Sequence, residues 1–199
     1  MKRTALVLFA LASMMITDIQ VTGRAFAQSR CSLTEATAPA VRGLKLGMSV
    51  EQVTALFPGS SKRKETKEAL AKAKAASEVV HVTFEPSDSG KDQNADIVSF
   101  SAGFDKGRVI DLSVQYLGPE WKNVDEWIAK LSETFGLPGV NNWQPGPSET
   151  PNKVLRCSGI EIEAAMEGGG GSITIRSTEN PNDSHDRARE EKKKRDFKP

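Results

Sequence analysis

Histidine and cysteine, which often serve as catalytic bases, nucleophiles and metal ligands, are scarce in this sequence. There are two of each among 199 residues. His185 lies in a highly charged C-terminal segment, and His81 alternates with apolar residues in a strand-like stretch. Two thiols without a nearby histidine do not make a zinc site. A general base needs a placed partner and a pocket. We therefore expect no metal ligands, no cofactor-binding residues and no catalytic residues.

The sequence also lacks a phosphate-binding loop and an excess of charge of one sign. The glycine run 168–171 joins two strand-like stretches, so no helix N-terminus follows it to bind a phosphate. Without residues 1–27 the chain has 24 basic and 25 acidic residues. This balance argues against a protein dedicated to nucleic acid.

No apolar run is long enough to cross a membrane. Residues 5–16 form the apolar stretch nearest the N-terminus, and about 12 residues cannot span a bilayer core that needs roughly 20. Lys2 and Arg3 precede this stretch, and Ala25-Phe26-Ala27 follows it as a small-x-small cleavage site. We interpret 1–27 as a signal peptide and expect a periplasmic or secreted protein without a transmembrane segment.

The two cysteines are far apart in the sequence. In an oxidising compartment, Cys31 and Cys157 are expected to form one disulfide that ties the N-terminal arm to a late strand. Two separate thiols are the alternative, because closeness in space is not visible in a sequence. A lipid anchor on Cys31 is not expected, since residues 28–30 lack the small residues of a lipidation signal.

The stretch 43–59 contains a strong helix start. Ser49 can cap the first turn and Gln52 can reach back to the Ser49 amide, which is the capping-box spacing. Met48 and Val53 have the spacing of a hydrophobic staple. Pro58-Gly59 ends the predicted helix.

Residues 46–53, which read L-G-M-S-V-E-Q-V, resemble the L-G-M-[ST]-x-x-[EQ]-V signature of the SmpA/OmlA family. That family includes the small outer-membrane accessory protein of the β-barrel assembly machinery. Its fold is shared by the secreted β-lactamase-inhibitor-like proteins. The resemblance implies an antiparallel sheet with helices packed on one face. From this resemblance we expect the fold but not the assembly role. Many family members are lipoproteins, whereas residues 28–30 of this chain lack the small residues of a lipidation signal.

A helix followed by strands occurs twice. Asn123 and Glu126 repeat the spacing of Ser49 and Gln52, 74 residues later. Alternating apolar residues predict strands after each helix. The predicted strands are 80–84, 98–104 and 110–116 after the first helix, and 154–157, 160–166 and 173–175 after the second.

These elements predict one α+β domain over 28–177, with possible α-β-β-β halves at 43–117 and 118–177. A chance similarity of two capped helices is the alternative to a pseudo-repeat. Residues 178–199 hold seven basic and six acidic residues and are expected to form a disordered charged tail.

The segment 62–74 has six basic and two acidic residues. It could bind anionic envelope polymers or lipid headgroups. We favour a solvated helix with no apolar stripe, because charge runs usually face water.

The sequence predicts a non-catalytic exported protein that binds another envelope or secreted protein. One sheet face should be free for a partner, and Tyr116, Trp121 and Trp143 are the candidate anchors. The alternative is a structural role, in which these rings are buried and close the ends of the core. The alternative function is an envelope hydrolase or a domain that binds cell-wall glycan.

Overall fold

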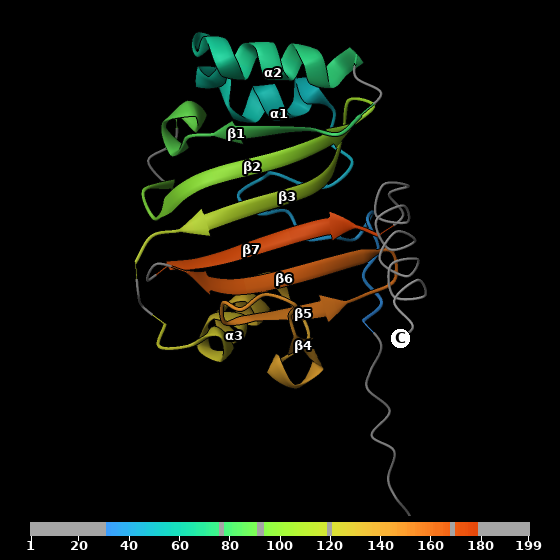
Figure 1. Cartoon of the computed structure of the whole chain (residues 1–199), viewed down its shortest axis with the longest axis vertical. Coiled ribbons are helices and arrows are strands. Elements are labelled where there is room, and N and C mark those ends of the chain that lie inside the picture. Colours follow the sequence, from blue (N-terminus) through green and yellow to red (C-terminus); the bar gives the residue numbers. More distant parts are fainter. Residues whose placement is uncertain (1–30, 76–77, 91–93, 119–120, 168–169, 179–199) are drawn as a thin grey trace, which may run out of the picture.

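A computed structural model describes residues 31–75, 78–90, 94–118, 121–167 and 170–178. Within them, seven strands form one antiparallel sheet in the order β1-β2-β3-β7-β6-β5-β4, and helices pack against it (Figure 1). The strands are β1 Val80–Phe84, β2 Ile97–Asp105, β3 Arg108–Tyr116, β4 Gln144–Pro145, β5 Asn152–Arg156, β6 Ile160–Glu167 and β7 Gly170–Ser177. The helices are α1 Val50–Leu56, α2 Lys64–Ala75 and α3 Val124–Phe135, with short 3-10 turns η1 Pro58–Lys62, η2 Pro86–Ser89 and η4 Val140–Asn142. The fold is α+β, as predicted.

The third strands of the two halves meet in the middle of the sheet. Leu112 of β3 pairs with Ile175 of β7, and Val114 pairs with Ile173. The order α1-β1-β2-β3 is therefore followed by α3-β5-β6-β7 in mirrored strand order. Two elements break the correspondence, since α2 occurs only in the first half and β4 only in the second. The short β4 had no clear signal in the sequence.

Alternation along the strands creates one apolar and one polar face. In β1 the buried residues Val80, Val82 and Phe84 alternate with exposed His81 and Thr83. The apolar face packs against residues from all three helices. These helix residues are Val50 and Val53 of α1, Leu70 and Ala73 of α2, and Trp127, Ile128 and Leu131 of α3.

The N-terminal arm, residues 31–48, is part of the core. Val41 and Leu44 are fully buried, and the Gly47 amide donates to the Val109 carbonyl at 2.8 Å. The arm begins at the predicted disulfide, where the Cα atoms of Cys31 and Cys157 lie 4.5 Å apart. The disulfide prediction is confirmed.

The two helix starts are also formed. The Gln52 amide donates to Ser49 Oγ at 3.3 Å and the Ser49 amide to Gln52 Oε1 at 2.8 Å, which completes a capping box. In α3, Asn123 Oδ1 accepts from the Glu126 amide at 3.0 Å. The Glu126 carboxylate accepts from the Lys122 amide instead of the Asn123 amide, so the second cap differs in detail from the first.

The expectation that segment 62–74 lacks an apolar stripe is wrong. Thr66, Leu70 and Ala73 are buried along one side of α2, where this helix lies alongside β1 (Figure 1). Thr and Ala hide this stripe in the sequence, because neither is strongly apolar. The lysines occupy the other side, where Lys74 bonds Glu51 of α1 at 2.7 Å. No helix in the described ranges is long and apolar enough to span a bilayer.

Two of the segments predicted from sequence fall largely outside the described residues. The signal peptide 1–27 lies outside them entirely. Of the charged tail 178–199, only Thr178 is described, and its amide donates to the Gly159 carbonyl at 2.9 Å.

Candidate functional site

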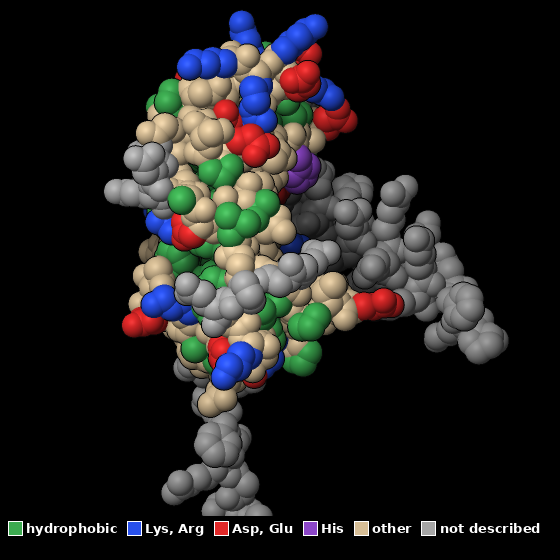
Figure 2. All heavy atoms as spheres, turned by 90° about the vertical axis from the view of Figure 1, so that its left-hand side faces the viewer, with side chains coloured by type: hydrophobic (Ala, Val, Ile, Leu, Met, Phe, Trp, Pro, Cys, Tyr) green, Lys and Arg blue, Asp and Glu red, His purple; other side chains and the backbone are tan. Residues whose placement is uncertain are grey.

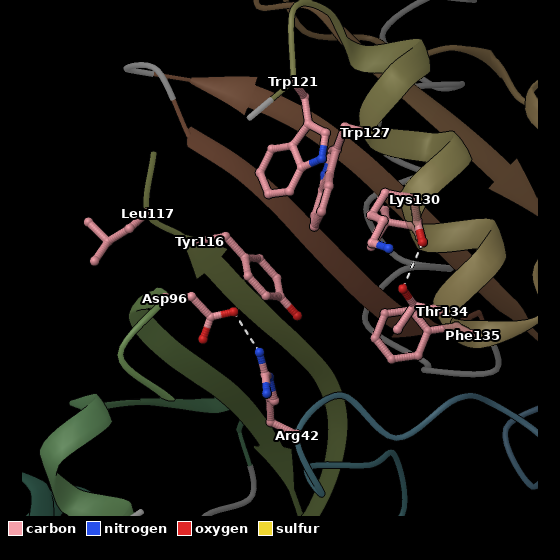
Figure 3. A pocket seen from close by; sticks show the side chains of 10 residues that line it. Arg42, Asp96, Tyr116, Leu117, Trp121, Trp127, Lys130, Thr134 and Phe135 are labelled. Carbon is pink, nitrogen blue, oxygen red and sulfur yellow. Dashed lines mark hydrogen bonds and ion pairs between the residues drawn. The ribbon is translucent and has the colours of Figure 1, made fainter. Parts of the chain in front are cut away.

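A half-open pocket of about 420 Å³ lies beside α3, at the end of the sheet where the interior strand β3 stops (Figure 3). Its size falls in the range of small-ligand and side-chain binding sites. The lining combines aromatic rings with a few charged side chains. The lining residues are Arg42, Asp96, Tyr116, Leu117, Trp121, Trp127, Lys130, Leu131, Thr134 and Phe135.

Trp127 of α3 is the fixed wall of this pocket. Its indole N–H donates to the Ser172 carbonyl at 2.8 Å, and its ring lies directly over Gly171, where a Cβ would approach it to 2.9 Å. Tyr116 meets the Trp127 ring edge-on at 5.1 Å, and the Trp121 ring lies 4.2 Å from it. Aromatic pairs at these separations add stability beyond buried area. Trp127 is therefore anchored on β7, and the rings of Tyr116 and Trp121 pack against it.

The polar part of the pocket comes from three separate segments. Arg42 of the N-terminal arm forms a salt bridge of 2.5 Å with Asp96, the residue that precedes β2. Lys130 of α3 bonds Glu133 at 2.9 Å. Burial raises the pKa of Tyr116, and the nearby Arg42 guanidinium partly offsets that rise. The phenol therefore stays protonated at neutral pH.

One lining residue of the pocket, Leu117, is apolar and exposed. Leu117 is 55% exposed, and it and Val98 are the exposed large hydrophobic residues in the described part of the chain. Both lie at the same end of the sheet, because the Leu117 amide donates to the Asp96 carbonyl at 2.7 Å, two residues from Val98. Figure 2 shows hydrophobic side chains gathered at mid-height on the face where β3 ends.

The structure brings together two of the three predicted anchors. Tyr116 and Trp121 both contact Trp127 in the pocket. Trp143 lies apart from them; it is buried, and its indole N–H donates to the Pro138 carbonyl at 2.9 Å. Its position suits the interpretation that it seals the end of the core.

The expected location of the anchors is corrected by the register. We expected aromatic residues on the free face of the sheet, but Tyr116 shares the helix-covered face with Val114 and Leu112. The pocket that these rings line therefore lies at the C-terminal end of the interior strand β3, beside α3. Trp127 and Phe135, which also line the pocket, were not among the predicted anchors. Nothing in the sequence connects Arg42 with Asp96, which is 54 residues away.

The open face of the sheet is polar and its charges pair along one row. The row runs His81, Gly103, Asp111, Arg176, Glu161 and Arg156 across six strands. Glu161 lies 3.1 Å from Arg156 and 4.0 Å from Arg176. His81 lies 3.7 Å from one carboxylate, that of Asp111, and its side chain is 61% exposed. A catalytic histidine needs a placed partner inside a pocket, and this exposed pair does not provide that arrangement.

The fold and pocket together define an α+β protein with a half-open aromatic pocket at the junction of two similar halves. Neither protein-family models, nor curated proteins, nor solved structures provide a match for this chain.

Proposed function

We propose that this is an exported, non-catalytic protein that binds another envelope or secreted protein through the aromatic pocket. The observation that carries the proposal is the aromatic wall formed by Tyr116, Trp121 and Trp127 in a pocket that also includes exposed Leu117. A few residues, often Trp, Tyr or Arg in well-packed pockets, carry most of the binding energy of protein–protein interfaces.

The polar groups of the pocket suit binding better than acid–base chemistry. Asp96 is engaged by Arg42, and the Tyr116 phenol has a raised pKa. A general base works best with a pKa near the operating pH and a free lone pair. These two groups instead orient and hold a bound segment.

Export is supported by the disulfide, because disulfides form and persist in oxidising compartments. The resemblance of residues 46–53 to the SmpA/OmlA family remains a prediction. Its implied sheet with helices on one face has the same layered arrangement as this structure. A glycan-binding or hydrolytic role on the open face stays the alternative, centred on His81 and Asp111.

Site-specific photo-crosslinking in producing cells tests the proposal. A photoreactive amino acid replaces exposed Leu117, and exposed Ala71 on α2 serves as the control position. We expect a discrete protein adduct at position 117 and none at 71, identified by mass spectrometry. Absence of adducts at 117, or the same adducts at both positions, would contradict the proposal.

A blocking substitution links the adduct to the pocket. Thr134→Arg places a long side chain at the rim, and Thr54→Arg on α1 is its matched control. Both threonines make the same bond to the carbonyl four residues earlier, at 2.8 Å and 2.7 Å respectively. We expect Thr134→Arg to remove the adduct at 117, while Thr54→Arg leaves it. An adduct that survives Thr134→Arg would place the partner outside the pocket.

A further inference from the structure

Hydrogen-bond donors outnumber free acceptors at the polar end of the pocket. Arg42, Lys130 and the Tyr116 hydroxyl all carry donor protons. Asp96 accepts one hydrogen bond from Arg42, Glu133 accepts one from Lys130 at 2.9 Å, and the Thr134 hydroxyl donates to the Lys130 carbonyl at 2.8 Å. These bonds use one of the five donor protons of Arg42 and one of the three of Lys130. A complementary ligand therefore brings acceptor atoms. Because two of the donors are cationic, a carboxylate is the acceptor that they bind most strongly.

The apolar and polar parts of the pocket are adjacent. Figure 3 shows Tyr116 and Phe135 facing each other across the opening, with Trp121 and Trp127 on one side and Arg42 on the other. Lys130 projects from α3 into the same space. A ring inserted between the aromatic walls would hold a neighbouring carboxylate close to Arg42 and Lys130.

From this arrangement we infer, building on the proposed function, the chemistry of the partner. It is a protein segment with a large apolar side chain, preferably aromatic, next to an Asp or Glu. The apolar side chain packs among Trp121, Trp127 and Phe135, and the carboxylate accepts hydrogen bonds from Arg42 and Lys130. Exposed Leu117 extends the apolar contact along the segment.

Titration with short peptides, followed by the indole N–H signals of the disulfide-bonded full-length protein, tests this chemistry. The probes are N-acetylated, C-amidated Ser-Gly-Phe-Asp-Gly-Ser and its versions with Ala for Phe or Asn for Asp. The signals of Trp121 and Trp127 are expected to shift, whereas that of Trp143, bonded to Pro138, is the internal control. We expect the Asn peptide to bind about 5-fold to 10-fold more weakly, because it cannot form charge-assisted bonds, and the Ala peptide to show no measurable shifts.

A charge substitution locates the carboxylate. Lys130→Gln should reduce the ratio of the affinity for the Asp peptide to that for the Asn peptide by about threefold. Lys67→Gln on α2, also an exposed helix position, should leave that preference unchanged. If both variants reduced this affinity ratio equally, the effect would be a long-range charge effect. That result would overturn the assignment of the carboxylate to Lys130.

The outcomes separate this inference from the proposed function. Equal affinity for the Asp and Asn peptides would overturn the carboxylate while leaving pocket binding intact. Shifts for no peptide, together with an adduct at position 117, would overturn the partner chemistry alone. Shifts for no peptide and no adduct would overturn both.

Discussion

Trp127 fills the core and forms the pocket wall at the same time. It is only 3% exposed, and its ring contacts Tyr116, Trp121 and the backbone of β7 at Gly171. Gly171 is required there because a side chain would occupy the space of the indole. Gly171, the second residue of β7, thus allows the close packing of Trp127 on the sheet.

Gly171→Ala should destabilise the protein by about 1–3 kcal/mol, since overpacking forces buried groups to move. The added Cβ would lie 2.9 Å from the indole ring of Trp127. Urea denaturation followed by circular dichroism measures the change. Gly139→Ala is the control, because it has a negative φ of −64° and open space around its Cβ position. Equal stability of the two variants would contradict the close packing described for Trp127.

Helices α1 and α2 show how charge joins elements at the surface. Glu51 of α1 bonds Lys74 of α2 at 2.7 Å. This bond, with smaller contributions from the Glu51 amide and Ser49, lowers the pKa of Glu51 from 4.5 to about 2. A lowered carboxylate pKa stabilises the folded state above the unfolded pKa, and the contribution is lost as the pH falls through the folded pKa.

The difference in stability between the native protein and Glu51→Gln should therefore be constant above about pH 4.5 and disappear as the pH falls to about 2. Urea midpoints of both proteins at a series of pH values measure it. Added salt should reduce the difference at neutral pH, because the pair is exposed to solvent. A difference that does not change with pH would mean that the Glu51 carboxylate gains nothing from Lys74.

At the scale of the whole molecule, the disulfide ties the first described residue to the second half. Cys31 and Cys157 are 126 residues apart in the sequence. The arm after Cys31 contains core residues such as Val41 and places Arg42 in the pocket lining. Cross-linking so long a loop reduces the entropy of the unfolded chain.

Cys31→Ser combined with Cys157→Ser should lower the free energy of unfolding by about 2–5 kcal/mol. The double substitution avoids a leftover thiol. Urea unfolding of the variant, and of the native protein with and without a reducing agent, measures the loss. Reducing the native protein also removes the disulfide, so it provides an independent measurement of the same loss. Midpoints that do not change on reduction would contradict a stabilising role for the disulfide.

Sequence patterns were most informative where structure depends on near neighbours. The caps at Ser49 and Asn123 were predicted because a cap needs only the residues of one turn. The strands β1, β2 and β3 followed from alternation with period two, which marks a strand with one buried face. The disulfide was predicted from the presence of only two cysteines in a chain expected to be exported.

The local sequence predicted the helices and most of the strands, because these depend on short-range periodicity and capping. Three contacts could be seen only in the folded protein: β3 pairs with β7, Tyr116 packs on the helix-covered face, and Arg42 bonds Asp96. The pocket depends on those three contacts between distant segments. No local pattern encodes them, since they arise when the apolar faces of the two halves are buried together.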